Sequence, residues 1–95
     1  MEKNVVVDKP PAQVYSDLQR ELKKEIPANV FSLIAWNEKE RTGKAAAFGA
    51  RVSFVVEDKQ PCTVRASLEI GPPASAMIRE SDVAARIETV LARLG

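Results

Sequence analysis

Residues 48–70 constrain the fold of this chain more than any other stretch. Apolar side chains alternate with polar or small ones along 48–57, and the alternation resumes along 62–70 after the turn-like segment 58–61. Successive side chains of a strand point to opposite faces, so this period predicts two half-buried strands joined by a tight loop. The side chains expected to face inward are Phe48, Ala50, Val52, Phe54, Val56, Cys62, Val64, Ala66, Leu68 and Ile70.

The pairing of these two strands follows from the same pattern, because inward residues must meet inward residues. A three-residue loop at 59–61 satisfies that condition and places Arg51 opposite Glu69 on the outer face. Cross-strand charge pairs of this kind contribute roughly 0.2 to 1 kcal/mol. We interpret the charges of the outer register as a solvated face rather than as a catalytic group.

Apolar residues recur at helical spacing near both ends of the chain. A stripe with a spacing of four predicts a first helix between Pro10 and Pro27, and a second stripe predicts a final helix from Ser81 onward, after the break at 71–73. The stripes consist of Val14, Leu18 and Leu22 in the first helix and of Val83, Ile87, Val90, Leu91 and Leu94 in the second.

The remaining segments are predicted to be strands. Three valines at 5–7 favour a short first strand, since β-branched residues suit a pleated surface. The nearly all-apolar segment 29–36 is predicted to form the second strand. The third strand is expected to begin at the alanines 45–47 and to continue to residue 57, with Gly49 marking a bulge.

These elements predict an α+β fold in a single domain over residues 1–95. We expect a two-layer sandwich with the element order β-α-β-β-β-α. Short connections between the last three strands favour an antiparallel sheet of about four strands, and both amphipathic helices can cover one face of it.

The segment 29–36 also suggests a function. Its apolar side chains occupy both registers, so one face of this strand is expected either to be covered or to form an exposed patch. A homodimer through that face, a hydrophobic small molecule or a granule surface would bury the patch. Trp36 is interpreted first as an anchor at the core edge, with ligand contact as the alternative. The residues expected to contact an apolar ligand are Trp36, Phe31, Leu33, Met77 and Ile78.

The composition argues against most catalytic chemistry. The chain has no histidine and one cysteine, which removes the commonest general base, the commonest zinc ligand and any Cys-x-x-Cys motif. We therefore expect no enzyme, no cofactor and no metal. The alternative, a small carboxylate-dependent enzyme, would rely on a group such as Glu57 in an apolar cleft.

Charge gives little reason to expect a nucleic-acid partner. The net charge is +1, from 14 basic and 13 acidic residues, so no strong long-range attraction to a polyanion arises. The α-β-β-β-α order over residues 10–94 is similar to that of a double-stranded-RNA-binding domain, which uses a basic cluster at the start of its second helix. Here residues 77–82 hold two acids and one base. Nucleic-acid binding is therefore only an alternative.

The location expected from the sequence is the cytoplasm. No apolar run approaches the ~18 residues of a transmembrane segment. Residues 1–4 lead into only three valines, so no signal peptide is expected.

Two resemblances add to this interpretation. The segment Pro11-Ala12-Gln13-Val14-Tyr15-Ser16-Asp17-Leu18 resembles the Pro-x-x-Val-aromatic opening of the first helix in START/Bet v1-like, helix-grip domains. Those domains wrap a curved antiparallel sheet around a long C-terminal helix and often hold an apolar ligand between the two. The resemblance implies a shortened version of that arrangement.

The second resemblance covers nearly the whole chain. In length and layout the chain is similar to the small polyhydroxyalkanoic acid system family, which has a tryptophan-bearing strand, a glycine-punctuated strand pair and a C-terminal helix with spaced Ile and Leu. This resemblance implies a cytoplasmic, non-enzymatic protein linked to polyester granules, with no catalytic residues. The similar positions are Trp36, Gly43, Gly49, the 52–56 strand, Leu68, Ile87, Leu91 and Leu94.

Overall fold

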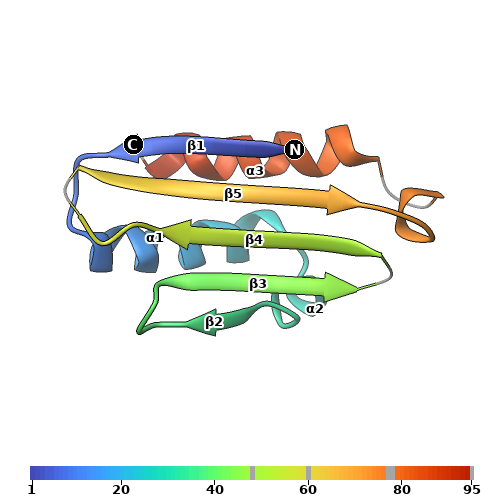
Figure 1. Ribbon diagram of the computed structural model, residues 1–95, viewed down its shortest axis with the longest axis horizontal. Helices are drawn as coiled ribbons and strands as arrows, with labels where there is room; N and C mark the ends of the chain where they lie inside the picture. The colour runs from blue at the N-terminus through green and yellow to red at the C-terminus, as the bar shows by residue number, and fades with distance from the viewer. Residues whose placement is uncertain (48, 60, 77–78, 95) are drawn as a thin grey trace.

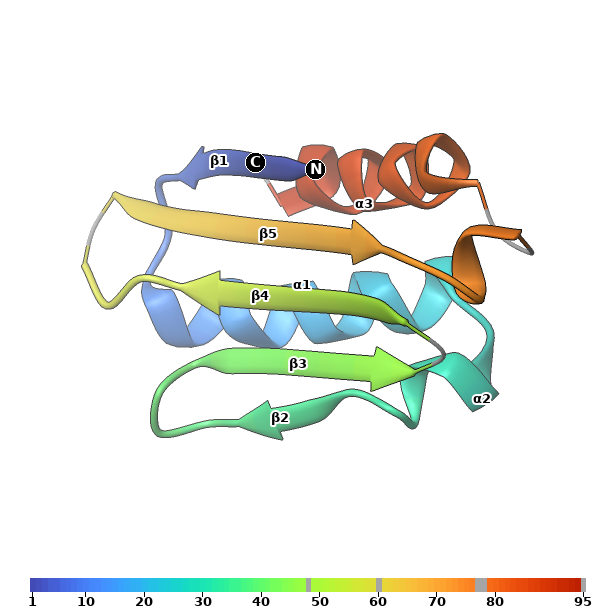
Figure 2. The same ribbon diagram turned by 45° about the vertical axis from the view of Figure 1, so that its right-hand side comes forward.

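The computed structural model describes the whole chain except residues 48, 60, 77, 78 and 95. Within these described residues, five antiparallel strands form one sheet in the order β1-β5-β4-β3-β2, and two long helices cover one of its faces (Figures 1 and 2). The predicted α+β two-layer class is confirmed. The elements are β1 (Glu2–Val7), α1 (Pro11–Glu25), α2 (Ala28–Phe31), β2 (Ala35–Asn37), β3 (Thr42–Ala47), β4 (Ala50–Val56), β5 (Cys62–Ile70), the 3-10 turn η1 (Ala74–Ala76) and α3 (Glu80–Leu94).

The central hairpin has the predicted register. β4 and β5 pair so that Arg51 lies opposite Glu69 and Val56 lies opposite Val64. The expected inner face is confirmed at its centre, because Phe54, Val56, Cys62, Val64, Ala66 and Leu68 are buried. Residue 48, predicted on the same face, lies outside the described residues.

The predicted third strand is wrong in one respect, because the chain reverses at its middle. Residues 42–47 form β3 and residues 50–56 form β4, which makes five strands among the described residues rather than about four. Gly49 therefore lies in a turn and not in a bulge. Its φ of 84° is a conformation that side-chain-bearing residues rarely adopt. The Gly71 N–H donates to the Gly49 carbonyl over 2.9 Å, so the turn is attached to the end of β5.

The predicted strand over 29–36 is also wrong in part. The helical turn α2 occupies its first residues, and only the last two belong to the three-residue strand β2. The physical reason is local: Pro27 precedes α2, and its carbonyl accepts the N–H groups of Val30 and Phe31 at 3.0 and 2.9 Å. The next three N–H groups continue this turn, as Ser32 donates to Ala28, Leu33 donates to Val30 and Ile34 donates to Phe31.

This correction removes the apolar segment 29–36 from the outer sheet face, where the dimer was expected. No continuous strand with two apolar faces exists at 29–36. The outer face of the central strands is mostly polar, with one valine: Arg51, Ser53, Val55, Thr63, Arg65, Ser67 and Glu69. The exposed large apolar side chains within the described residues are Val6 on β1 and Val30 and Leu33 around α2. Two of these three side chains therefore lie together at the α2 end of the molecule, whereas Val6 lies apart from them on β1.

The two long helices cover the inner face as their stripes predicted. On α1 the residues Val14, Leu18 and Leu22 are buried, and on α3 the buried residues are Ile87, Val90, Leu91 and Leu94. Arg93 of α3 reaches back to α1, where its Nη1 lies 3.2 Å from the Glu25 carboxylate. Within the described residues, no helix is both long enough and apolar enough to cross a membrane.

Candidate binding cavity

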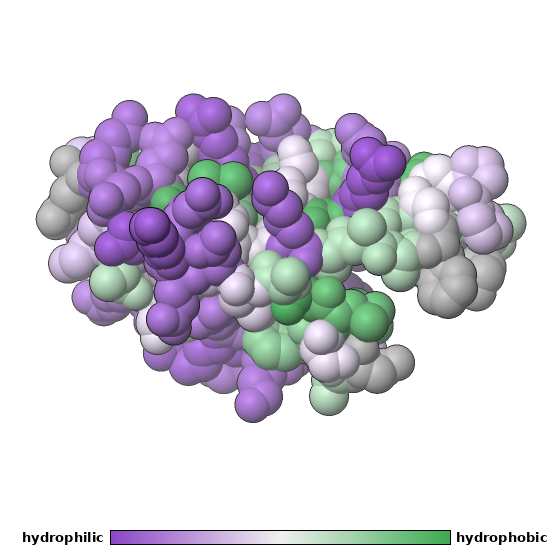
Figure 3. All heavy atoms as spheres, turned by 60° about the horizontal axis from the view of Figure 1, so that its bottom comes forward, coloured by the Kyte–Doolittle hydropathy of each residue, from purple (hydrophilic) through white to green (hydrophobic). Residues whose placement is uncertain are grey.

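A cavity opens between the two layers at the end of the molecule where α2 lies. Its volume is about 420 Å³, within the usual range of ligand pockets. Figure 3 shows hydrophobic residues gathered around an indentation at the right-hand end of the molecule. We call this space the inter-layer cavity. Its lining residues are Leu22, Ile26, Val30, Leu33, Ile34, Ala45, Ala46, Ala47, Ala50, Arg51, Val52, Phe54, Leu68, Ile70, Ala74, Val83 and Ile87.

Small side chains on the sheet explain why this space is not filled. On the inner register, β3 presents Ala45 and Ala47, and β4 presents Ala50 opposite Ala47. Further along the same face the sheet carries Phe54, which is buried against the helices. An alanine projects one methyl group from the sheet, so the helical layer above these three positions meets no large side chain. The cavity therefore follows from a local run of alanines.

The wall of the inter-layer cavity is almost entirely apolar. Among the described residues that line it, only Arg51 carries a polar side chain. The described part of the chain also has no buried polar or charged residue. An acid or base acting on a substrate inside the cavity would need a titratable group there. The arrangement is suited to holding an apolar molecule.

The five residues expected to bind a ligand are distributed over three places. Leu33 lines the inter-layer cavity and is 57% exposed at its rim. Phe31 and Trp36 pack against the core and are not part of the cavity wall. Met77 and Ile78 lie outside the described residues.

Trp36 is the centre of an aromatic cluster beside the cavity. Its ring centroid lies 5.7 Å from that of Tyr15, 6.1 Å from that of Phe31 and 6.5 Å from that of Phe54. Trp36 and Gly43 face each other across β2 and β3, and the missing side chain of Gly43 makes room for the indole. The Trp36 Nε1 is buried and has no hydrogen-bond partner within the described part of the chain. This geometry favours a role at the edge of the core.

Tyr15 connects the cluster to the start of β3. Its hydroxyl donates to the Thr42 carbonyl over 3.2 Å. Burial raises the pKa of this hydroxyl above its ordinary value, and the nearby Glu38 carboxylate raises it further. Tyr15 is therefore neutral at physiological pH. It is a packing residue whose hydrogen bond also connects α1 to the start of β3.

The single cysteine lies at the other end of the sheet from the cavity. Cys62 is buried, and its Sγ lies 3.3 Å from the Glu57 carbonyl. Burial raises the pKa of the thiol, and the Glu57 carboxylate adds to that effect. A buried, protonated thiol is a poor nucleophile, which favours the interpretation of Cys62 as a small core residue.

The carboxylate that a carboxylate-dependent enzyme would use lies far from the cavity. Glu57 follows the end of β4 that is opposite the α2 end. Its oxygens form ion pairs with Arg65 at 2.7 Å and with Lys59 at 3.2 Å. No group of three or more His, Cys, Asp or Glu residues that could hold a metal ion occurs within the described ranges.

Sequence reasoning missed the residues that make the cavity. The periodic pattern assigns the alanines at 45, 47 and 50 to strands without a functional role, and it treats Val83 as an ordinary residue of the final helix stripe. The available signal was three small residues on the inner register next to large ones. That signal could suggest a gap in the sheet face, but it does not show which residues of the helical layer lie over the gap.

Comparison of the chain with models of known protein families, with curated proteins and with solved structures finds no significant match.

Proposed function

We propose that this protein is a non-enzymatic binding module that takes up a hydrophobic small molecule in the inter-layer cavity. The observation that carries the proposal is the cavity itself, which is apolar on nearly all sides and about 420 Å³ in volume. Removing apolar surface from water contributes about 25 cal/mol per Å². Binding would remove apolar surface of both the ligand and the cavity wall from water, and this would stabilise the complex. A cytoplasmic location is part of the proposal.

The two family resemblances support the same class of ligand. A helix-grip arrangement holds an apolar ligand between the sheet and a long C-terminal helix, which is where the cavity lies relative to α3. The polyhydroxyalkanoic acid system resemblance adds a second candidate target, the surface of a polyester granule. The exposed side chains Val30 and Leu33, 43% and 57% exposed, favour that second candidate because both lie at the cavity rim.

A carboxylate-dependent enzyme and a nucleic-acid-binding domain have less support. Glu57 is held in surface ion pairs away from the cavity. The first turn of α3 contains Glu80 and Asp82 rather than a basic cluster, and Glu80 pairs with the N-terminal amine at 3.1 Å. A second copy of the chain is another candidate occupant of the apolar patch around Val30 and Leu33.

Filling the cavity tests the proposal. We expect wild-type protein to bind the neutral fluorophore N-phenyl-1-naphthylamine with a rise in emission. Ala47→Leu places a larger side chain inside the cavity, and we expect it to weaken this binding by about tenfold, which is ~1.4 kcal/mol. The variant should keep or raise the thermal midpoint, because filling a cavity generally stabilises a protein.

Ala92→Leu is the matched control, since it makes the same change at an exposed position of α3 that is not on the cavity wall. We expect this variant to bind the fluorophore as wild type does. The proposal fails if wild type does not bind the fluorophore, or if Ala47→Leu and Ala92→Leu bind it equally well.

A further inference from the structure

Among the residues that the structure describes, no strand covers the edge of β3 beside the cavity. Within that same set, β2 pairs with β3 only at Thr42, Gly43 and Lys44. Extending the same register would place Leu33 opposite Ala46, but the Leu33 N–H is already donated to Val30 in the turn after α2. The second half of β3 is therefore left open on this side.

The hydrogen-bond pattern turns the N–H and C=O of one residue toward this open edge. The Val56 N–H donates to the Arg41 carbonyl over 3.0 Å, which marks that pair as hydrogen-bonded in the β3–β4 ladder. In an antiparallel strand, the N–H and C=O of one residue point toward the neighbouring strand on one side, and those of the next residue point toward the other side. Ala45 and Ala47 thus bond to β4, whereas the N–H and C=O of Ala46 face the uncovered side.

A second depression adjoins the cavity at this edge. It lies on the outer face of the sheet, has a volume of about 570 Å³, and is called the outer hollow here. Residues that line both spaces are Leu33, Ala45, Ala46, Arg51 and Val52. Of these, Leu33, Ala45 and Ala46 lie at the open edge of β3, whereas Arg51 and Val52 lie one strand further in, on β4. The two spaces therefore share this part of the sheet as a common wall and are both bordered by the open edge. The other residues of the outer hollow are Ala35, Lys44, Ser53, Ser67 and Glu69.

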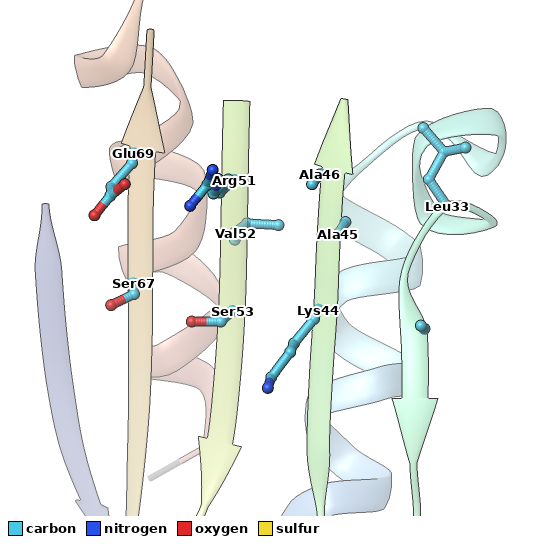
Figure 4. Close-up of a pocket in the computed structure, with 10 residues that line it drawn as sticks. Leu33, Lys44, Ala45, Ala46, Arg51, Val52, Ser53, Ser67 and Glu69 are labelled. Atoms are coloured by element: carbon cyan, nitrogen blue, oxygen red, sulfur yellow. The ribbon is translucent and has the colours of Figure 1, made fainter. Parts of the chain in front are cut away.

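The outer hollow contains two cations that form no close ion pair with the described residues. Arg51 and Lys44 form no ion pair within 4.0 Å with any residue that the structure describes. By contrast, Arg65 on the same face pairs with Glu57 at 2.7 Å. Figure 4 shows Lys44, Arg51 and Glu69 along three adjacent strands of the hollow. Glu69 lies directly opposite Arg51 and offsets part of its charge, so the hollow is left with an excess of one positive charge, which favours an anion.

We infer that the ligand of the inter-layer cavity is amphipathic, with a hydrocarbon tail and a single carboxylate head. This inference rests on the proposed function and specifies its ligand class. The tail occupies the cavity, and the chain leaves it around the open edge of β3. The carboxylate then meets the guanidinium of Arg51, whose planar donors match a carboxylate. The Ala46 N–H lies at the same edge as a further donor, and Lys44 adds positive charge.

Two ligands of equal tail length test the head-group assignment at pH 8, where the acid is ionised. Decanoate and the neutral alcohol decanol are each used to displace N-phenyl-1-naphthylamine from the protein. We expect wild type to bind decanoate more tightly than decanol. Arg51→Gln should weaken decanoate binding by about fivefold, as expected for one partly exposed ion pair, and leave decanol binding unchanged.

Arg65→Gln is the matched control, because it removes the same charge from the same sheet face outside the outer hollow. It should change neither ligand's affinity by as much as Arg51→Gln changes that of decanoate. The carboxylate inference is overturned, while the cavity proposal stands, if wild type binds decanoate no better than decanol or if Arg51→Gln weakens both ligands equally. If neither ligand displaces the fluorophore and the fluorophore itself does not bind, both the inference and the proposed function fail.

Discussion

At the scale of single residues, the fit of Trp36 over Gly43 decides how the sheet edge is built. A Cβ placed on Gly43 would lie 2.5 Å from the Cζ3 atom of the indole. Trp36 itself contacts three other aromatic rings, so it cannot move away without loss of packing. The glycine is therefore required by the tryptophan.

This fit predicts the effect of one added methyl group. We expect Gly43→Ala to lower the free energy of unfolding by about 1 to 3 kcal/mol through overpacking, as measured by urea denaturation. Gly71→Ala is the control, since a Cβ there would meet only the Gly49 carbonyl at 3.4 Å, and its effect should be smaller. Equal effects of the two substitutions would show that the Trp36 side chain shifts to accommodate the added methyl group at no cost in stability.

At the scale of elements, α2 changes where the apolar surface of the protein lies. A continuous strand at 29–36 would have placed its apolar side chains on the two faces of the sheet. The helical turn instead places Val30 and Leu33 at the cavity rim and leaves the sheet a mostly polar outer face. Any apolar partner is therefore expected at this end of the molecule.

The granule candidate can be tested on this element. If the patch binds a polyester surface, wild-type protein should cosediment with poly(3-hydroxybutyrate) particles. Leu33→Glu should weaken that binding by about tenfold or more, because burying a leucine contributes about 1.5 to 3 kcal/mol.

Val6→Glu is the control for this test. It adds the same charge at a position that is 62% exposed on β1, on the opposite edge of the sheet, and it should sediment as wild type does. Equal sedimentation of wild type and Leu33→Glu would rule out docking through this patch.

At the scale of the whole molecule, one chain provides both layers of the core and the full wall of the inter-layer cavity. β1 pairs with β5, which places the first strand at one edge of the sheet, and β2 forms the other edge near the cavity. The cavity walls come from α1, the α2 region, the sheet and α3 of the same chain. On the proposed function, ligand binding would thus require no second copy.

Native mass spectrometry of the purified protein tests this prediction. We expect the mass of one chain together with a retained small molecule that disappears on denaturation. The identity of that molecule would also report on its head group. A clean mass of two chains would instead show that the patch around Val30 and Leu33 is a self-interface, and the search should then turn to protein partners.

The parts of the fold that the sequence by itself determined are those with a local period. The alternation along β4 and β5 predicted their inner face and the pairing of Arg51 with Glu69, and the stripes of α1 and α3 predicted which helix faces are buried. A repeat of two or of 3.6 residues follows from backbone geometry alone, so it is visible in the chain before folding.

Only the tertiary structure decided the rest. The apolar run 29–36 contained no period that distinguishes a strand from a turn of helix. In the structure, the hydrogen bonds that the Pro27 carbonyl accepts make its first residues helical. The cavity is a still less local property. The short side chains of Ala45, Ala47 and Ala50 leave a space only because the residues of α1, α2 and α3 above them do not reach into it. A void is defined by what several distant segments fail to fill, and no single segment of the sequence contains that information.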